Sequence, residues 1–198
     1  MLKKEKQFLM SLALGDGYVR KRGESYSIAV SHCEKQKEYL IYKAERLSQI
    51  IGKKVEIHGF QVSGYPTWRF EVSNDYFHFV RNWLYREGNK TISICYLRKL
   101  SDEGVAIWYM DDGSLVAKRR NGKIHAFDLT VSTYCSEEEA SICIQFFKER
   151  YDTNFTIKRN KRKFSIRCGT KEAKKLLYHL MPYIHPIMRY KTFQTAST

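Results

Sequence analysis

Two Asp-Gly pairs, each closing an apolar run, are the residues best placed to do chemistry. Residues 9–17 read Leu-Met-Ser-Leu-Ala-Leu-Gly-Asp-Gly, and residues 105–113 read Val-Ala-Ile-Trp-Tyr-Met-Asp-Asp-Gly. A lone Asp-Gly is usually a turn. Here each aspartate is predicted in the last turn of a helix, facing the negative end of its dipole, which costs roughly several tenths of a kcal/mol unless a cation offsets it. The repeated placement therefore indicates a bound cation.

Asp16 and Asp112 are predicted to lie close together. Ser11, Ala13 and Gly15 are small, which would let the first apolar helix approach the second closely. Two carboxylates a few Å apart do not both ionise easily without a metal, and Mg²⁺ prefers oxygen ligands. Such a metal can bind a phosphate, activate a water and stabilise the leaving oxygen, so the pair suits phosphodiester hydrolysis.

The two motifs open an internal repeat that spans the chain. Each is followed by a predicted hairpin, at 18–22 and 26–32 in the first half and at 114–120 and 124–133 in the second. A helix, two alternating strands and an amphipathic helix come next in both halves. The fold class is therefore α+β, with two pseudo-symmetric αββαββα repeats that each carry a four-stranded antiparallel sheet. We predict an N-terminal half at 1–92, a linker at 93–102 and a C-terminal half at 103–198.

Apolar spacing predicts which side chains are buried. The middle helices would bury Leu40, Ala44, Leu47 and Ile51 in the first half, and Ala140, Ile144, Phe147 and Tyr151 in the second. The closing helices would bury Tyr76, Phe79, Val80 and Trp83, and Ala173, Leu176, Leu177 and Leu180. The third strands are placed at Val55 and Ile57 and at Phe155 and Ile157, and the fourth at Trp68, Phe70 and Val72 and at Phe164, Ile166 and Cys168.

A Lys-Thr pair follows the closing helix of each half, at Lys90-Thr91 and Lys191-Thr192. A single lysine is usually a solvated surface charge, and only the repeat argues otherwise. Because the two lysines recur in step with the motif aspartates, pseudo-twofold symmetry should bring both to the centre of the molecule. There they could stabilise a charged transition state or assist the attacking water.

Composition narrows the partners and the compartment. The 35 Lys and Arg against 21 Asp and Glu give a net charge of +14, which attracts a polyanion: DNA, RNA or an anionic membrane surface. Five cysteines without a Cys-x-x-Cys favour neither a disulfide framework nor a zinc site, and indicate a reducing, intracellular compartment. Lys3 to Lys6 before the run Phe8 to Leu14 imitates a short secretory signal, but the counterpart of this segment in mid-chain favours a place in the fold. No stretch approaches transmembrane length.

Residues 9–17 and 105–113 resemble the two motifs of double-motif LAGLIDADG homing endonucleases, and Met-Arg-Tyr-Lys-Thr at 188–192 is similar to the end of members encoded in group I introns. The resemblance implies that the motif helices form the interface between halves and that Asp16 and Asp112 bind the catalytic metal. It also implies that the backbone carbonyls of Gly15 and Asp111 contribute to metal binding. Family lysines map onto Lys90 and Lys191. A polar residue of the second strand, often Gln in the family, corresponds to Ser31 and Ser132, a departure at both positions.

The implied function is a metal-dependent double-strand cut at a long asymmetric DNA site. Mg²⁺ is the expected cofactor, with Mn²⁺ substituting and Ca²⁺ supporting binding without cleavage. The expected partners are double-stranded DNA and its own intron RNA, with no membrane, and the expected active form is a monomer. Its place would be the cytoplasm or nucleoid of a prokaryote or phage host, or an organelle matrix. The gene would be free-standing or intron-encoded.

Strand parity predicts which residues of the two sheets face DNA. Arg can read guanine from a β-ribbon in the major groove, whereas most lysines would contact phosphate. The halves differ at nearly every such position, so a palindromic target is not expected. In the first half the residues are Tyr18, Arg20, Arg22, Lys54, Arg69 and Glu71, and in the second Ser114, Val116, Lys118, Arg120, Thr156, Lys158, Ser165 and Arg167. The run 158–163 is the strongest basic cluster, either a solvated hairpin tip or a phosphate contact.

Two alternatives compete with this interpretation. Tyr109-Met110-Asp111-Asp112 spells a reverse transcriptase signature, but that motif lies in a strand-turn-strand hairpin, whereas 103–110 is predicted as a helix. An RNA-binding maturase, or a non-cutting DNA-binding protein on the same fold, would keep the basic faces. Intact aspartates in both motifs favour cleavage.

Overall fold

The computed structural model describes residues 1–161 and 163–193, and the main chain alone at Thr133. Arg162 in the basic run and residues 194–198 of the predicted C-terminal half lie outside this range. No helix among the described residues is long and apolar enough to span a membrane.

Each half of the molecule contains the predicted order of elements. The first half consists of α1 (Lys3–Leu14), β1 (Tyr18–Arg22), β2 (Ser25–Cys33), η1 (Glu34–Gln36), α2 (Lys37–Ile51), β3 (His58–Val62), β4 (Tyr65–Ser73) and α3 (Phe77–Leu84), followed by β5 (Tyr85–Arg86), β6 (Asn89–Lys90) and α4 (Ile94–Leu97). The second consists of α5 (Asp102–Asp112), β7 (Gly113–Arg120), β8 (Lys123–Cys135), α6 (Glu137–Tyr151), β9 (Thr156–Asn160), β10 (Lys163–Gly169), α7 (Thr170–Leu180), η2 (Met181–Tyr183) and η3 (Pro186–Lys191).

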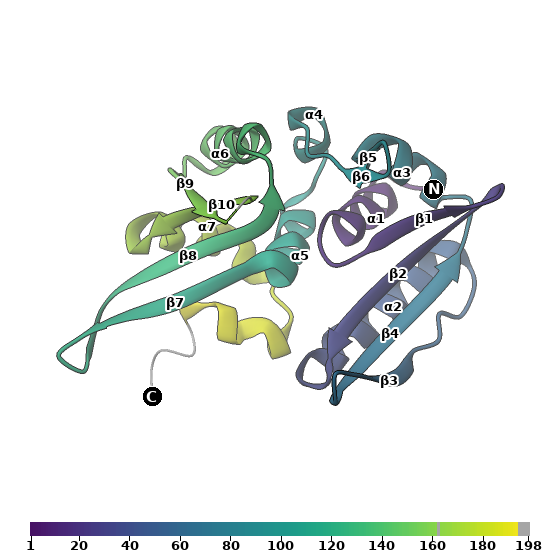
Figure 1. Ribbon diagram of the computed structural model, residues 1–198, viewed down its shortest axis with the longest axis horizontal. Helices are drawn as coiled ribbons and strands as arrows, with labels where there is room; N and C mark the ends of the chain where they lie inside the picture. Colours follow the sequence, from purple (N-terminus) through teal and green to yellow (C-terminus); the bar gives the residue numbers. More distant parts are fainter. Residues whose placement is uncertain (162, 194–198) are drawn as a thin grey trace.

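The two sheets have the same topology. Their strand orders are β1-β2-β4-β3 and β7-β8-β10-β9, and every neighbouring pair is antiparallel. Figure 1 shows the sheets side by side, with α1 and α5 between them and α2 and α7 behind. The predicted fold class, two αββαββα repeats each with a four-stranded antiparallel sheet, is confirmed. The reverse-transcriptase-like sequence at 109–112 lies in α5 and not in a strand-turn-strand hairpin, so the predicted helix is also confirmed.

Helices α1 and α5 form the junction of the two halves. Their apolar runs are buried on all sides, because each helix packs against the other and against its own half. Small residues allow α1 and α5 to approach closely at two points along their length. A Cβ built on Gly104 would lie 3.4 Å from the Ser11 Cβ, and one built on Gly15 would clash with the Asp111 carboxylate. Ser11 and Gly15 are four residues apart and therefore share one face of α1.

Most of the predicted buried faces hold, including Leu40, Ala44 and Leu47 on α2. The prediction for α3 was wrong in part. Phe77, Val80 and Leu84 are its buried residues, whereas Tyr76 and Trp83 are exposed. The helix begins at Phe77, one residue later than assumed, and Trp83 lies outside the buried stripe under the Lys99 ammonium, 4.7 Å away.

The third strand of the first half starts later than predicted. Residues 53–57 precede β3 as a loop held to α2, where the Val55 amide donates to Ser48 Oγ at 2.9 Å. Lys54 lies in this loop and pairs with Glu56 at 3.3 Å, so its predicted place on the open face of the sheet was wrong. Polar contacts with the preceding helix, which the alternating pattern does not reveal, delay the strand.

The segment after α7 returns to the first half of the molecule. The Gln36 amide donates to the Tyr190 hydroxyl at 2.8 Å. The His185 ring packs against Tyr39 and Tyr42, with centroids 5.7 Å and 5.4 Å away. The C-terminal segment therefore ties η1 and α2 to the second half.

We expect Gly15→Ala to lower the free energy of unfolding by about 1–3 kcal/mol, because the added methyl group overpacks a buried helix contact. Chemical denaturation measures this. Gly169→Ala is the matched control, since a Cβ there meets nothing within 4 Å, and it should cost no more than about 0.5 kcal/mol. Equal losses in the two variants would show that the helices are not tightly packed at Gly15.

Candidate active site

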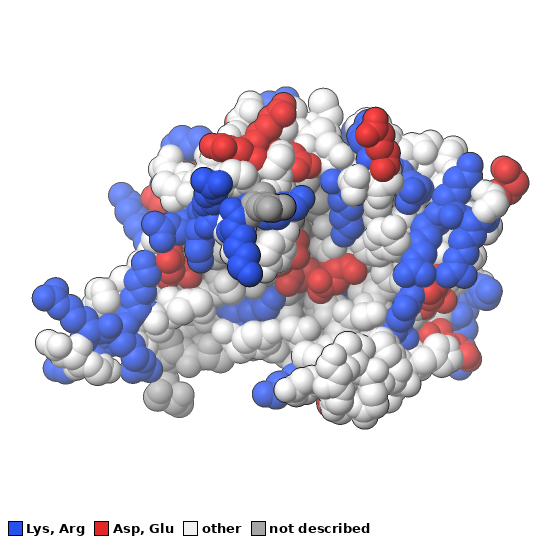
Figure 2. Space-filling model, in the orientation of Figure 1, with Lys and Arg blue, Asp and Glu red and all other residues white. Residues whose placement is uncertain are grey.

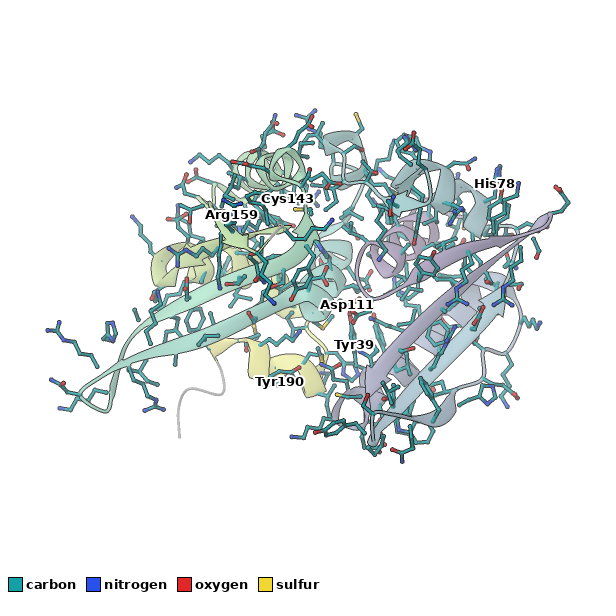
Figure 3. The ribbon with its side chains drawn as sticks, in the orientation of Figure 1. Tyr39, His78, Asp111, Cys143, Arg159 and Tyr190 are labelled. Atoms are coloured by element: carbon teal, nitrogen blue, oxygen red, sulfur yellow. The ribbon has the colours of Figure 1, made fainter. Side chains whose placement is uncertain are left out.

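The C-terminal ends of α1 and α5 meet at the centre of the molecule, between the two sheets. The Asp16 amide at the end of α1 donates to Asp111 Oδ2 at 3.0 Å. Figure 3 labels Asp111 at this junction, and Figure 2 shows acidic side chains gathered there between basic flanks. The predicted convergence of the two motif ends is therefore seen in the structure.

The repeated lysines bind the motif ends in matching ways. Lys90 Nζ donates to the carbonyl oxygen of Gly15 at 2.7 Å and to that of Leu14 at 3.4 Å. Lys191 Nζ donates to the carbonyl of Met110 at 2.6 Å and to that of Asp111 at 3.2 Å. Since Gly15 and Asp111 occupy the same motif position, the two ammonium groups are related by the pseudo-twofold axis.

Short local elements hold these lysines in place. Lys90 ends the β5–β6 hairpin, whose turn uses Glu87 and Gly88 at positive φ. Lys191 ends η3, where its own carbonyl accepts a 2.6 Å hydrogen bond from the Tyr109 hydroxyl. Local structure therefore fixes the backbone of both lysines, and hydrogen bonds to the motif carbonyls hold their ammonium groups.

Asp112 lies in its own small pocket. Its Oδ2 accepts a 3.1 Å hydrogen bond from Trp108 Nε1, one turn earlier in α5. The cavity has a volume of about 120 Å³ and is lined by Leu14, Lys90, Ile92, Trp108, Asp112, Tyr134, Cys135, Glu139 and Lys163. Lys90 of the first half therefore faces the aspartate of the second, so this centre is composite.

Burial and mutual repulsion destabilise the charged aspartates. Burial and the nearby Asp111 carboxylate raise the pKa of Asp16 to about 6 and that of Asp112 to about 7. Among the cations, Lys43 and then Lys191 lower the pKa of Asp16 most, and Lys90 that of Asp112. Burial likewise lowers the pKa of Lys90 and Lys191 from the ordinary lysine value, against the facing carboxylates.

A buried network that the sequence did not predict surrounds Asp16. The side chains of Lys43 and Asp111 are fully buried and form an ion pair at 2.5 Å. Lys43 Nζ also lies 3.0 Å from His32 Nε2. On the other side of the ring, His32 Nδ1 lies 2.9 Å from Gln36 Oε1 and 3.6 Å from Asp16 Oδ2.

Burial and the Lys43 ammonium lower the pKa of His32 to about 4, so the ring is neutral at neutral pH. Nε2 then accepts from Lys43, and Nδ1 carries the proton that points to Gln36 and Asp16. One signal for this network was present in the sequence, because Lys43 follows Leu40 by three residues and so falls on the apolar face of α2.

The donor atoms at the helix ends fit a divalent cation. Burial and the Asp111 carboxylate raise the pKa values of Asp16 and Asp112, and the carbonyls of Gly15 and Asp111, which accept from Lys90 and Lys191, lie at the same helix ends. Asp16, His32 and Asp111 also place ligand atoms within 4.8 Å of one another. Within that group, however, Asp111 is bound to Lys43 and to the Asp16 amide, so Asp16 and Asp112 are the carboxylates better placed for a metal.

Ser31 and Ser132 lie in β2 and β8. Ser31 is exposed and pairs across the sheet with Arg69, while its neighbour His32 points to the buried side and approaches Asp16. Ser132 is half-buried in the stretch of β8 where the register with β10 shifts. The structure therefore brings His32, rather than Ser31, to the motif end.

The predicted open face of the first sheet is seen in the structure. Tyr18 and Arg22 are exposed and Arg20 half-buried on β1, whereas Val19 between them is buried. Glu71 of β4 pairs with Arg69 and, at 3.3 Å, with Arg22. An acidic residue therefore fixes two guanidinium groups that could contact DNA.

The second sheet repeats this feature. Asp128 of β8 pairs with Lys118 at 3.2 Å and with Arg167 at 3.8 Å. Figure 2 shows basic side chains on the β7–β8 hairpin, above β9 and β10, and across the first sheet. The predicted residues Val116, Arg120, Thr156 and Lys158 are exposed and Ser114 is half-buried, while the Thr156 hydroxyl donates to the Arg167 carbonyl at 3.3 Å.

Ser165 is an exception to the predicted face. Its side chain is buried and its hydroxyl donates to the Lys158 carbonyl at 3.3 Å. The register between β8 and β10 shifts between Phe164 and Ile166. Phe164 pairs with Cys135 and Ile166 with Val131, so a step of two residues in β10 corresponds to a step of four in β8. Parity counting does not foresee this bulge, so the predicted place of Ser165 on the open face of the sheet was wrong.

The sequence is similar to that of known DNA endonucleases. The model of the LAGLIDADG DNA endonuclease family matches residues 6–176. Probable intron-encoded DNA endonuclease 3 of Mycosarcoma maydis is 29% identical over 62% of this chain and 84% of its own length. Probable intron-encoded endonuclease 1 of Wickerhamomyces canadensis is 25% identical over 94% of this chain and 83% of its own length.

Solved structures share the fold. The homing endonuclease I-WcaI bound to its DNA recognition sequence superposes with a TM-score of 0.81 at 23% identity, over 96% of this chain and 86% of that one. Structures of I-DmoI in complex with DNA and Ca or Mn superpose with TM-scores of 0.52 and 0.54 at 12% identity, over 91% and 92% of this chain and 89% and 98% of those chains.

The raised pKa values predict how pH and metal affect stability. Asp16 and Asp112, with pKa values of about 6 and about 7 against 3.8 unfolded, bind more protons when folded. Their contribution therefore favours folding at acidic pH and is lost as pH rises through 6 and 7. We expect Asp16→Asn/Asp112→Asn to raise the melting temperature in EDTA more at about pH 8 than at about pH 5.5.

Ca²⁺ should raise the melting temperature of the wild type mainly at the higher pH, where protons no longer compete for the carboxylates. The lowered pKa of His32 makes its contribution to stability change with pH in the opposite direction. Because the wild type and the Asn variant both contain His32, this contribution cancels in the comparison, and the difference between them reports on the two aspartates. An equal gain from the Asn variant at both pH values would contradict the assigned burial of charge.

Proposed function

The chain belongs to the LAGLIDADG DNA endonuclease family and is a DNA-cleaving hydrolase. On that premise we propose that it is a homing endonuclease, which makes a metal-dependent double-strand cut at a long asymmetric site. The observation that carries the proposal is the pair of aspartate–lysine centres at the joint between two basic sheets. Two centres related by a pseudo-twofold axis match the two antiparallel strands of a duplex.

The residues of each centre have separable roles. Asp16 and Asp112, with the carbonyls of Gly15 and Asp111, would hold divalent cations, which would supply charge stabilisation and an activated water. Lys90 and Lys191 present ammonium groups where negative charge builds up on the phosphate. Their lowered pKa values reflect partial desolvation, which strengthens their interaction with that charge.

The open sheet faces would hold the DNA on either side of the centres. Arg20, Arg22 and Arg69 serve the first half-site, and Lys118, Arg120 and Arg167 the second. Because the two faces carry different side chains at corresponding positions, the half-sites differ in sequence and a single chain reads both. The active form is a monomer.

We assign Mg²⁺ as the cofactor, with Mn²⁺ as a substitute and Ca²⁺ supporting binding alone, since small hard cations suit a carboxylate and carbonyl set. The matched structures of I-DmoI with DNA and Ca or Mn support a divalent metal. Double-stranded DNA is the substrate, and the intron RNA of its own gene is a second partner to test in the same assay.

The function is tested with DNA that joins the sequences flanking the gene's own insertion point, incubated with Mg²⁺. The wild type should release a double-strand break, and either Asp16→Asn or Asp112→Asn should abolish it while DNA affinity in Ca²⁺ stays within about threefold. Each variant loses one carboxylate ligand of the metal, whereas the basic faces are unchanged. Normal cutting by either variant would refute the two-centre arrangement, and tight binding of intron RNA without DNA cutting would identify a maturase.

Lys90→Met and Lys191→Met should each slow single-turnover cleavage by roughly 10²-fold with little change in affinity, because transition-state charge loses its partner. Lys171→Met, an exposed lysine of α7, is the matched control and should cut normally. A lysine variant that cuts at the wild-type rate once saturated with DNA would leave that residue as a phosphate contact only.

A further inference from the structure

The pseudo-twofold symmetry of the site is broken at one buried ion pair. Asp111 corresponds to Gly15 in the repeat, and Lys43, the seventh residue of α2, corresponds to Cys143, the seventh of α6. Lys43 and Asp111 are a charged pair with fully buried side chains, whereas a glycine and a buried cysteine occupy the matching places. Figure 3 shows Cys143 on α6, away from the junction where Asp111 and Tyr39 lie.

The pair is connected to Asp16 both directly, through Asp111, and through His32. Asp111 accepts the Asp16 amide at Oδ2 and binds Lys43 at Oδ1. Lys43 bonds His32, whose other ring nitrogen lies 3.6 Å from the Asp16 carboxylate. Lys43 Nζ also lies 4.2 Å from the centre of the Tyr39 ring, so the ammonium is enclosed on several sides. The network therefore restrains both the backbone and the side chain of Asp16.

Asp112 is held by a different and simpler set of contacts. Its carboxylate accepts from the Trp108 indole within the same helix, and the Trp108 ring stacks on Phe147 with centroids 5.6 Å apart. The two motif aspartates, equivalent in the repeat, therefore depend on separate supporting groups. A change in one set of supports need not reach the other centre.

We propose that Lys43 and Asp111 are positioning residues for the Asp16 centre alone, so that the two DNA strands are cut by chemically unequal centres. This rests on the proposed function. Groups that hold a metal-binding side chain without touching the metal typically change affinity or rate by about 10–100-fold when removed. The Lys43–Asp111 pair would act on one strand, and the Trp108 indole on the other.

The test compares two variants that should have opposite effects. Lys43→Met/Asp111→Asn removes both buried charges, since deleting one partner would leave an unpaired charge and destabilise the fold. Trp108→Phe removes only the donor to Asp112 and keeps an aromatic ring against Phe147. Each strand of the target duplex is labelled separately, and its single-turnover cleavage is followed in Mg²⁺.

We expect the double variant to slow one strand about tenfold relative to the other, and Trp108→Phe to shift the ratio in the opposite direction. Nicked product should accumulate with opposite strands open in the two variants. If both variants slow the same strand, or slow both strands equally, the proposal is overturned.

A second readout needs no DNA. In the Asp112→Asn background, Lys43→Met/Asp111→Asn should weaken Ca²⁺ binding about tenfold, as measured by titration calorimetry or by the shift in melting temperature. In the Asp16→Asn background the same substitutions, which remove one positive and one negative charge together, should change Ca²⁺ affinity far less. Equal losses in both backgrounds, or none, would overturn the proposal. If the wild type cuts neither strand, the proposed function fails and this metal titration alone decides the inference.

Discussion

The close approach of two helix ends is the constraint on which the rest of this structure depends. It concentrates the carboxylates of Asp16, Asp111 and Asp112 at the negative ends of two helix dipoles, an arrangement that is unfavourable by itself. Lys43, Lys90 and Lys191 offset it from three directions, each drawn from a different element. Small residues allow the two helix ends to approach, while the β5–β6 hairpin and the C-terminal segment position Lys90 and Lys191 beside them.

The parts of this site that obey the repeat could be predicted from the sequence, and the parts that break it could not. Asp16, Asp112, Lys90 and Lys191 recur in step, so symmetry alone placed them together. His32 and the carboxylate of Asp111 have no repeated counterpart, and the Lys43–Asp111 pair forms only because one half packs against the other. Lys54 and Ser165 were misplaced because a loop bound to α2 and a strand bulge interrupt simple alternation.

The two sheet faces share an arrangement of ion pairs that the composition alone does not reveal. On each, one carboxylate binds two cationic side chains: Glu71 holds Arg22 and Arg69, and Asp128 holds Lys118 and Arg167. Such pairs contribute little to stability at an exposed surface. They restrict long side chains to fewer rotamers before any partner arrives, which lowers the entropy lost on binding.

The return of the C-terminal segment has a consequence for the order in which the protein becomes active during synthesis. Asp111, Tyr190 and Lys191 leave the ribosome only after the whole first half has been synthesised. Until then Lys43 has no buried partner and Asp16 faces no second centre. A chain that ends before these residues therefore keeps the basic face of the first sheet but lacks the second set of residues that complete the site.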